Sequence, residues 1–336
     1  MGRPLVSVVV LNWNGRAHLQ DCLQSLRRQR LGGVEIILVD NGSRDDSVAF
    51  VKKRFAGVRV IENRANLGFC AGNNVGLRAA RGELVALLNN DTEVSPGWLE
   101  SLVKDAAAHP GAGLFASRML LFDRRDTIDS AGDLFFAAGF AAKRGWLEKN
   151  DARFDRACPV FGACAGAALY RRDMLEEIGL LDEDFFANGE DVDLSFRARL
   201  AGYECRYVPG AVVYHKGGAT IGQSPRWFYL MRRNQLWVVV KNMPRELLRR
   251  YWPQMLFYNL ASLAYHPLRG RAALLFRAYR DALGGLNRMH RKRRRIQRQR
   301  RASADDIHAI LSHGGIFQRA LRPVTGRLAT SAYSVQ

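Results

Sequence analysis

The first 90 residues alternate short apolar runs with amphipathic stretches, and this pattern restricts the fold more than any other feature of the sequence. Runs rich in Val, Ile and Leu are typical of buried strands, and they occupy residues 6–11, 35–39, 58–61 and 84–88. Stretches with helical spacing of apolar residues lie between them, at about 16–28, 45–54 and 71–80. This order predicts an α/β fold with a mostly parallel sheet that is covered on both faces.

Polar side chains follow three of these strands at the point where each strand ends. Asn12 follows the first strand, Asp40 the second, and the run Asn89-Asn90-Asp91 the fourth. Ligands of open α/β sheets bind at the carboxyl ends of the strands. We therefore expect the three endings to converge on one edge of the sheet and to form a binding site there.

The run Asn89-Asn90-Asp91 has two interpretations. A carboxylate at a strand end suits a hard divalent ion, because Mg²⁺ is commonly held by one or two carboxylates together with substrate phosphates. The other interpretation is a turn with Asx hydrogen bonds. A helix is expected to begin near Pro96, with Ser95 as its N-cap.

A second acidic segment opens a predicted helix over residues 190–200. Glu190, Asp191 and Asp193 would stabilise the positive end of the helix dipole, which explains one or two of the three. Phe185 and Phe186 come just before them, and an apolar wall beside a carboxylate is a setting that tunes a general base. Asp191 is our hypothesis for a base that deprotonates an acceptor hydroxyl.

His215 follows a further predicted strand, over residues 205–214. A histidine at a strand end is a potential metal ligand, although a single histidine is more often structural. The break at residues 217–225 separates this region from a sequence that is helical almost throughout.

Charge is distributed very unevenly along the 336 residues, whose net charge is +19. Residues 1–221 hold 28 basic and 28 acidic side chains, residues 222–301 hold 20 and 2, and residues 302–336 hold 3 and 2. We therefore expect a catalytic domain over 1–221, a basic amphipathic helical region over 222–301, and a tail over 302–336.

The basic region has three interpretations. Residues 251–268 carry no charged side chain but include Pro253 and Pro267, so they are too broken for a membrane span. We favour binding in the plane of an anionic membrane surface, to which the basic run 291–295 would add attraction. A solvated helix packed on the catalytic domain and a nucleic-acid-binding tail are the alternatives. Five cysteines without a C-x-x-C pair, and an N-terminus without a signal-peptide pattern, favour the cytoplasmic side.

Seven ordered blocks between Val6 and about Asn242 resemble the inverting glycosyltransferases of family 2, in particular their bacterial rhamnosyltransferase-like branch. The blocks are VSVVVLNWNG (6–15), VDNGSRDDS (39–47), NLGFCAGNNVGL (66–77), LLNNDTEV (87–94), GACAGAALYRR (162–172), GLLDEDFF and GEDVDLSFRARLAGY (179–203), and VPGAVVYH (208–215). The resemblance implies a GT-A fold, that of the nucleotide-diphospho-sugar transferases, with a C-terminal helical extension.

The resemblance also implies roles for individual residues. The nucleotide-sugar donor would be bound by Asn12, Asp40, Asn66, Asn90, Asp91, Arg232, Arg233 and Asn234. Asp191 would be the base, with Glu190 beside it, and Gly166, Ala167 and Trp98 would lie near the acceptor. Mg²⁺ or Mn²⁺ would be held by Asp91 and His215, since position 89 is Asn where a strict Asp-x-Asp motif has Asp.

The implied reaction is the transfer of rhamnose, a hexose or an N-acetylhexosamine with inversion of configuration. A dTDP- or UDP-sugar would be the donor, and a glycan or a polyprenyl-diphosphate-linked glycan the acceptor, in cell-surface polysaccharide synthesis at the inner face of the membrane. A dehydrogenase is disfavoured because no G-x-G-x-x-G follows the first strand, and no P-loop is present. A non-catalytic binding protein of the same fold is a further alternative.

Overall fold

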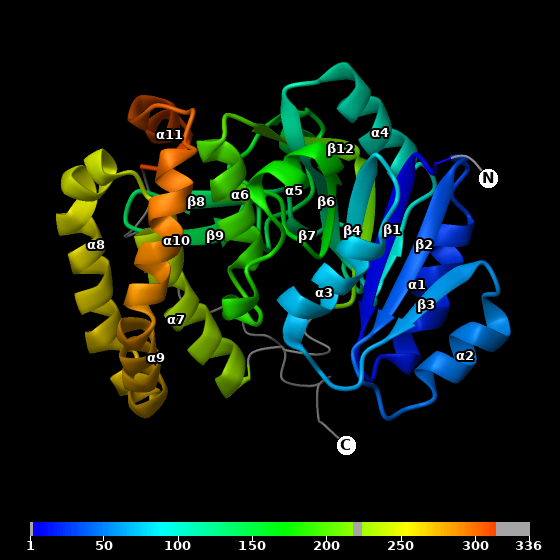
Figure 1. Cartoon of the computed structure of the whole chain (residues 1–336), viewed down its shortest axis with the longest axis horizontal. Helices are drawn as coiled ribbons and strands as arrows, with labels where there is room; N and C mark the ends of the chain where they lie inside the picture. Colours follow the sequence, from blue (N-terminus) through cyan, green and yellow to red (C-terminus); the bar gives the residue numbers. More distant parts are fainter. Residues whose placement is uncertain (1–2, 218–223, 314–336) are drawn as a thin grey trace.

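The computed structural model describes residues 3–217 and 224–313. Strands and helices alternate through the first part in the predicted order, as β1 (Val6–Asn12), α1 (Arg16–Arg27), β2 (Val34–Asp40), α2 (Ser47–Arg54), β3 (Val58–Glu62), α3 (Gly68–Ala79) and β4 (Leu84–Asn89). The prediction of an α/β fold is confirmed (Figure 1).

The middle part is richer in strands than the sequence suggested. It contains β5 (Thr92–Val94), α4 (Trp98–Ala108), β6 (Ala112–Leu121), β7 (Ile128–Ser130), β8 (Asp133–Phe136), β9 (Phe140–Lys143), β10 (Cys158–Pro159), β11 (Ala167–Arg171), α5 (Arg172–Ile178), α6 (Glu190–Leu200) and β12 (Glu204–His215). The expected N-cap Ser95 is wrong: α4 begins at Trp98, and Gly97, with a φ of 83°, is its N-cap. Ser95 instead accepts a backbone hydrogen bond from the N–H of Trp98.

Ten strands form one sheet, whose main path runs β10-β12-β6-β11-β4-β1-β2-β3. The neighbours β4, β1, β2 and β3 are parallel, and β11 is antiparallel to both β4 and β6. Asn12 pairs with Asp40, and Leu11 pairs with Asn89. This register places the polar endings at the same level, so their predicted convergence on one edge is confirmed.

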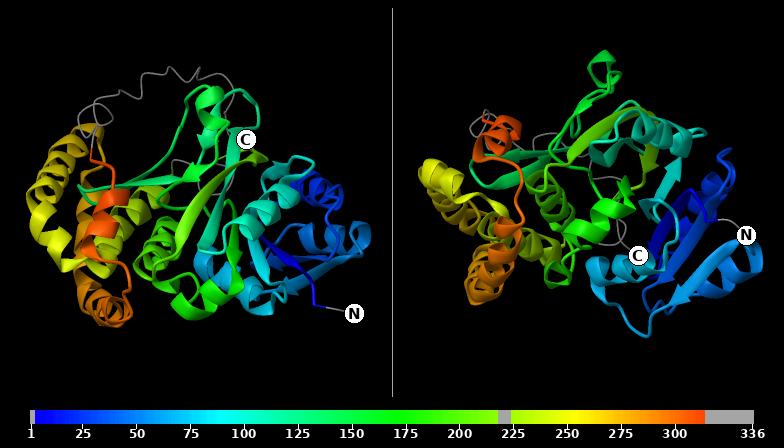
Figure 2. Two further views of the ribbon diagram at one scale, coloured as in Figure 1. Left: turned by 90° about the horizontal axis from the view of Figure 1, so that it is seen from above. Right: turned by 45° about the horizontal axis from the view of Figure 1, so that its top comes forward.

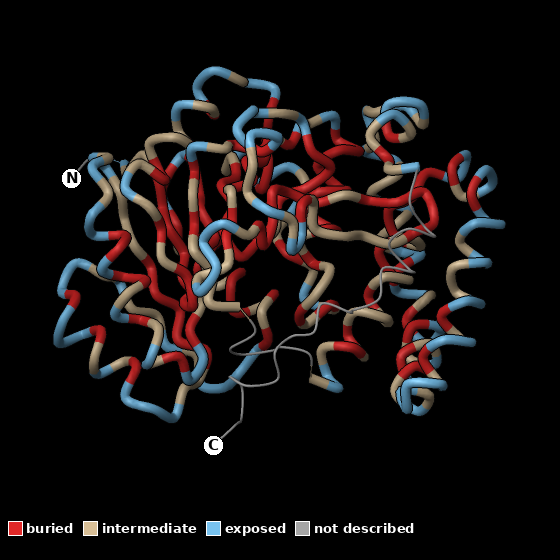
Figure 3. Tube along the Cα trace, turned by 180° about the vertical axis from the view of Figure 1, so that it is seen from behind, coloured by how far each residue is buried: buried red, intermediate tan, exposed pale blue. Residues whose placement is uncertain are grey.

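Both faces of the sheet are buried. Val6, Val8 and Val10 of β1 pack with helices α1 and α4, and Val9, which points the other way, packs on the side of α3. Figure 3 shows this buried interior as a continuous band through the strands. A strand buried on both faces requires an unbroken apolar run, which is why these strands were readily predicted.

Within residues 224–313, five α-helices follow the sheet region, and they share its core. They are α7 (Pro225–Asn242), α8 (Arg245–Tyr265), α9 (Ala272–Gly284), α10 (Leu286–Arg298) and α11 (Ala304–Ile310). Trp237, Met289 and Leu311 belong to the same apolar cluster as Phe185 and Phe135 of the preceding region. All the views place these helices against one side of the sheet (Figures 1 and 2), so the core continues across the expected boundary at residue 221.

A buried ion network joins α6 to α7. Asp193, which is fully buried, accepts hydrogen bonds from Lys241 at 2.8 Å, from Arg197 at 2.9 Å and from Asn242 at 2.8 Å. Lys241 also pairs with Asp182. Burial acts to raise the pKa values of Asp182 and Asp193, but the adjacent Lys241 outweighs it and both pKa values are lowered. This ionised network therefore holds α6 against α7.

Replacing Lys241 with methionine would remove the cation that Asp182 and Asp193 share, leaving Asp193 with Arg197 and Asp182 with Lys292. We expect the free energy of unfolding at pH 7 to fall by about 3–5 kcal/mol. Because both carboxyl pKa values are lowered in the folded protein, this stabilisation is complete above a pH of about 4 and is lost below it. Urea denaturation at pH 7 and in acid should show the difference from the wild type narrowing as the pH falls.

Lys52→Met is the matched control, because Lys52 pairs with Glu62 on the surface and both side chains are more than half exposed. Its effect should be below about 1 kcal/mol. Equal effects of the two substitutions would show that the network does not anchor α6.

Candidate functional site

The carboxyl edge of the sheet is built around three hydrogen-bonded polar side chains. Asn12 donates to Asp40 at 2.9 Å, and Asn90 donates to Asn12 at 2.8 Å. The second oxygen of Asp40 accepts from the backbone N–H of Ser43 at 2.9 Å. Three of the eight expected donor-binding residues, Asn12, Asp40 and Asn90, lie together here and are joined by hydrogen bonds.

A second asparagine cluster lies beside this edge. Asn41, which is buried, donates to Asn66 at 3.0 Å and accepts from Asn63 at 3.1 Å. Asn66 also accepts from the backbone N–H of Gly68 at 2.9 Å, at the start of α3. Sequence analysis named Asn66 but missed Asn41, although Asn41 directly follows Asp40 at the same strand end.

The side chains of Asn89, Asn90 and Asp91 point in three directions. The amide of Asn89 faces Gly166, where a Cβ would lie 3.2 Å from its nitrogen. Asn90 binds Asn12, and Asp91 contacts the Nε2 atom of His215 at 3.4 Å. The run therefore connects a nucleotide-side cluster, the Gly166 loop and a carboxylate–histidine pair.

His215 lies between two carboxylates. Its Nδ1 atom is 2.9 Å from Asp129, and Lys143 donates to the other oxygen of Asp129 at 2.8 Å. Burial acts to lower the pKa of His215, but Asp129 and Asp91 outweigh it and raise the pKa to about 9. Burial acts to raise the pKa of Asp91, and His215 lowers it below the ordinary value. Sequence analysis missed Asp129 and Lys143, which come from short strands in the region it left irregular.

Asp91 and His215 fit a divalent metal that is shared with a donor. Within residues 3–217 and 224–313, no three His, Cys, Asp or Glu side chains are grouped to hold a metal on their own. Asp129 holds Nδ1, so a metal beside Asp91 would take the Nε2 atom that faces Asp91 and would displace the proton that the raised pKa of His215 keeps there, an arrangement that is common for metal-binding histidines. Coordination by two protein side chains together with phosphate oxygens of the substrate is typical of Mg²⁺.

Asp191 stands at the start of α6 and faces the Gly166 loop. One of its oxygens accepts from the backbone N–H of Ala165 at 3.3 Å, and the other from its neighbour Val192 at 2.8 Å. Burial raises the pKa of Asp191 above its ordinary value. Burial, followed by the charge of Asp191, raises the pKa values of Glu190 and Asp133 well above theirs. Of the three carboxyl groups, Asp191 is the one whose oxygens accept hydrogen bonds from the backbone of Ala165 and Val192, and these hydrogen bonds favour its ionised form.

The loop before α6 has unusual backbone geometry. Phe186, Asn188 and Gly189 have positive φ angles of 64°, 68° and 86°, a conformation that is costly for residues with a side chain. Asn234 of α7 offsets this cost, because its amide group donates to the carbonyl oxygens of Phe185, Ala187 and Asn188. Helix α7 therefore determines where α6 begins.

Arg232, Arg233 and Asn234 are engaged with protein groups in the structure, and their contact with a donor diphosphate stays a prediction. Asn234 is fully buried and pins the loop. Arg233 donates to the carbonyl oxygen of Phe185 at 2.9 Å, and Arg232 donates to Tyr258 at 3.0 Å. None of the three contacts Asp91, because the orientation of α7 about its axis is determined by tertiary packing.

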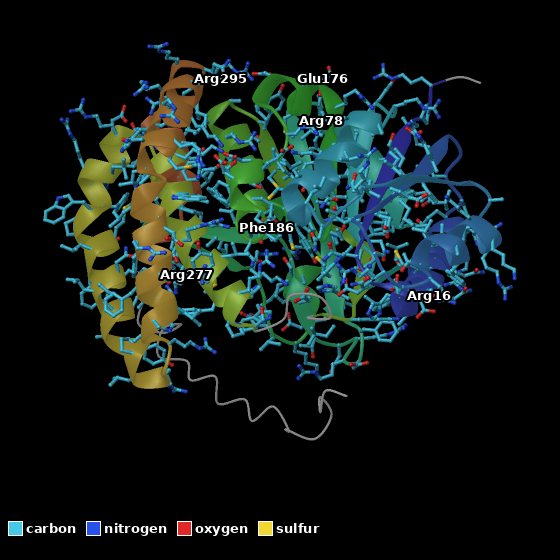
Figure 4. All side chains as sticks on the ribbon, turned by 60° about the horizontal axis from the view of Figure 1, so that its bottom comes forward. Arg16, Arg78, Glu176, Phe186, Arg277 and Arg295 are labelled. Carbon is cyan, nitrogen blue, oxygen red and sulfur yellow. The ribbon has the colours of Figure 1, made fainter. Side chains whose placement is uncertain are left out.

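Trp98 also needs correction as an acceptor-binding residue. Its side chain is fully buried, and its indole N–H donates to Ser117 at 2.9 Å. Gly166 and Ala167 do lie between Asn89 and Asp191, at the start of β11. Phe186, labelled in Figure 4, lies close to Gly68 of α3 and carries Arg226 of α7 over its ring at 4.4 Å.

This mostly parallel sheet, with asparagine and aspartate side chains at the carboxyl ends of its strands, has the GT-A fold. Two solved structures share the fold. GalNAc-T7, solved with UDP, GalNAc and Mn²⁺, superposes with a TM-score of 0.58 at 18% identity, over 72% of this chain and 49% of that one. Residues 1–349 of TarS from S. aureus superpose with a TM-score of 0.56 at 16% identity, over 87% of this chain and 90% of that one.

Sequence comparison defines the class further. The model of glycosyl transferase family 2 matches residues 7–179, and the chain belongs to this family. The N-acetylglucosaminyl-diphospho-decaprenol L-rhamnosyltransferase of Mycobacterium tuberculosis is 27% identical over 245 residues, which are 66% of this chain and 79% of that protein. An uncharacterized protein of Sinorhizobium fredii is 30% identical over 66% of this chain, and the match spans only 26% of its length.

The asparagine cluster leaves no room for a side chain at Gly15. A Cβ there would lie 2.0 Å from the Asn90 amide nitrogen and 2.5 Å from the Asn12 oxygen. Gly15→Ala should therefore displace both side chains and weaken nucleotide binding by about tenfold or more. Titration calorimetry with UDP and dTDP measures the change. Gly57→Ala, at a position with open space, is the control and should bind normally.

Asp129→Asn should weaken Mn²⁺ binding in the presence of UDP by about 10- to 100-fold, because His215 loses the carboxylate that orients its ring. Titration with Mn²⁺, followed by its electron paramagnetic resonance signal, reports this without any turnover. Asp126→Asn changes an exposed carboxylate nearby and should leave the affinity unchanged. Unchanged affinity in Asp129→Asn would contradict the assigned orientation of His215.

Proposed function

We propose that the chain is a metal-dependent, inverting glycosyltransferase that moves rhamnose, a hexose or an N-acetylhexosamine from a dTDP- or UDP-sugar to a hydroxyl of a lipid-linked glycan. One observation carries the proposal. Asp191 is hydrogen-bonded to Ala165, and the next residue, Gly166, adjoins Asn89 of the run that ends in Asp91. A base and a metal-binding pair thus lie on either side of the Gly166 loop.

The residues divide the work as follows. Asn12, Asp40 and Asn90 bind the nucleotide side of the donor, and Asp91 with His215 holds the metal. The bound metal supplies positive charge that stabilises the departing diphosphate. Asp191 accepts the proton of the acceptor hydroxyl, and its raised pKa suits this role, since a base works best near the operating pH.

The electrostatics of the acidic cluster support inversion. A double displacement with retention requires a second, ionised carboxylate as nucleophile. The pKa values of Glu190 and Asp133 lie well above their ordinary range because both groups are buried near Asp191, and this disfavours the ionised form that a nucleophile needs. Glu190 is buried beside Asp191, which contributes to its raised pKa.

The donor and acceptor classes are suggested by relatives. The Mycobacterium tuberculosis relative is named for rhamnose transfer to N-acetylglucosaminyl-diphospho-decaprenol. A polyprenyl-linked acceptor lies in a membrane, and we place the enzyme at its cytoplasmic face in polysaccharide synthesis. Residues 1–221 would carry out the transfer, and residues 222–301 would contact anionic lipid.

The described helices bear on how such contact could be made. None of them in residues 3–217 and 224–313 is both long and apolar enough to cross a bilayer. Within the basic run, Lys292 bonds Asp184 at 2.6 Å and Arg293 donates to Val240 at 3.0 Å. Arg291, Arg294 and Arg295 are exposed. Part of the basic run therefore packs on the catalytic region, which reduces the charge available to nucleic acid or lipid.

Asp191→Asn should fold and bind UDP or dTDP normally, and should lose about 100- to 10,000-fold in transfer rate because no base takes the acceptor proton. Transfer from dTDP-rhamnose and UDP-sugars to a synthetic N-acetylglucosaminyl-diphospho-lipid measures the rate. Asp305→Asn, which changes an exposed carboxylate, is the control. Near-normal turnover by Asp191→Asn would remove Asp191 as the base, and a product that retains the donor's anomeric configuration would contradict inversion.

A further inference from the structure

A cavity of about 680 Å³ lies between α7, α9 and α10, outside the donor site. Its walls carry four arginines and two aromatic side chains, namely Arg233, Arg280, Arg288, Arg291, Tyr229 and Trp237. Asp281 is the one acidic residue among its lining residues. The walls therefore carry a clear excess of positive charge.

Asp281 contributes little negative charge to an incoming ligand, because its oxygens are already engaged. Tyr229 donates to one of them at 2.7 Å, and Arg280 pairs with the other at 2.9 Å. Arg288 is paired with Asp184 at 2.9 Å, behind the wall. For Arg291, no ion pair is found with any residue that the structure describes. Protein carboxylates thus balance only part of the positive charge that lines the cavity, and a bound anion would balance the rest.

Two of the four arginines, Arg233 and Arg288, are held in place before any ligand arrives. The guanidinium carbons of Arg233 and Arg288 lie 4.2 Å and 5.4 Å from the centre of the Trp237 ring. Gly285, at the junction of α9 and α10, approaches the same ring so closely that a Cβ would lie 2.5 Å from it. Fixed guanidinium groups lose little freedom on binding and recognise phosphate oxygens in pairs.

The cavity adjoins an exposed apolar strip on α9. Phe276 and Leu283 are 60% and 63% exposed, and they are four residues before and three residues after Arg280. Residues at these spacings share one face of a helix, so the strip begins beside a wall of the cavity. A phosphate-binding hollow next to exposed hydrocarbon matches a ligand that has an anionic group and an apolar chain.

The cavity is also linked to the catalytic loop. Arg233 donates to the carbonyl oxygens of Asp184 and Phe185, and Arg288 pairs with the Asp184 carboxylate. This is the loop that leads to Asp191. An anion held by Arg233 and Arg288 therefore lies against the same segment that positions the base.

We propose that this cavity binds the diphosphate group of a prenyl-diphosphate-linked acceptor, with the first part of the prenyl chain on Phe276 and Leu283. The inference rests on the proposed function, whose acceptor it locates on the C-terminal helices. Arg233 and Arg291, which form no ion pair with a described residue, supply positive charge to the diphosphate, with Arg280 and Arg288 beside them. The apolar strip leads the chain of the ligand away from the cavity. The ligand class is thus a lipid-linked diphosphate in preference to a free phosphate or a phospholipid headgroup.

The test is calorimetric binding of geranyl diphosphate and of inorganic pyrophosphate to the full chain. The double variant Arg280→Gln/Arg291→Gln should weaken geranyl diphosphate binding by about tenfold or more. Arg294→Gln/Arg295→Gln removes the same charge from exposed positions on α10 outside the cavity, and should change binding by less than about twofold. Figure 4 shows Arg295 at the far end of the α9–α10 pair from Arg277.

The variant Leu283→Ser tests the contact with the prenyl chain separately from the contact with the diphosphate. It should weaken geranyl diphosphate binding and leave pyrophosphate binding unchanged. Equal affinity for pyrophosphate and geranyl diphosphate in the wild type would overturn the prenyl assignment in favour of free phosphate. Equal losses of affinity for geranyl diphosphate in the two double-arginine variants would show that the cavity is not the binding site. Loss of flotation with phosphatidylglycerol vesicles in Arg280→Gln/Arg291→Gln, with geranyl diphosphate binding unchanged, would assign the arginines to a phospholipid surface instead.

Failure of this inference is distinguishable from failure of the proposed function. If the function holds and the inference fails, Arg280→Gln/Arg291→Gln will keep a wild-type KM for a lipid-linked acceptor while Asp191→Asn loses turnover. If the inference holds, the KM for that acceptor rises and the KM for the donor is unchanged. Geranyl diphosphate binding tests the cavity even if no sugar is transferred.

Discussion

The position of the catalytic edge depends on one buried carboxylate, that of Asp193. It is surrounded by Arg197 on its own helix and by Lys241 and Asn242 on α7, so that two helices distant in sequence share one charge cluster. An unpaired charge at this depth would be too costly to bury, and the two helices therefore have to meet with their polar groups aligned. Asp191 lies two residues before Asp193 on the same helix, so the same ion network also positions Asp191.

The first half of the fold was predictable because its signals are local. Strands buried on both faces must be continuously apolar, and polar residues such as Asn12, Asp40 and Asp91 stand out where such runs stop. The middle region was less predictable. Asp129 and Asp133 lie on strands of three and four residues, which are too short to show a periodicity, and His215 and Asp191, which they approach in the fold, are distant in sequence.

The directions in which Arg232, Arg233, Asn234 and Trp98 point could not be predicted, for one physical reason. The sequence places Arg232, Arg233 and Asn234 on a helix, but consecutive residues of a helix point in directions about 100° apart, and packing decides which direction faces the site. In the structure Arg232 faces α8, Arg233 faces the cavity, and Asn234 faces the loop before α6. Trp98 was misassigned in the same way, since its burial follows from the sheet face that α4 covers.

Asn234 illustrates how the two parts of the chain have become inseparable. A single amide group on α7 holds three carbonyl oxygens of a loop that belongs to the preceding region. A recombinant enzyme in which the helices after residue 224 were exchanged for those of a relative would lose this clamp unless the segment 182–193 was exchanged with it. For protein engineering, the unit of exchange is therefore defined by the contact surface between loop and helix, and its boundary does not coincide with any break in the charge pattern of the sequence.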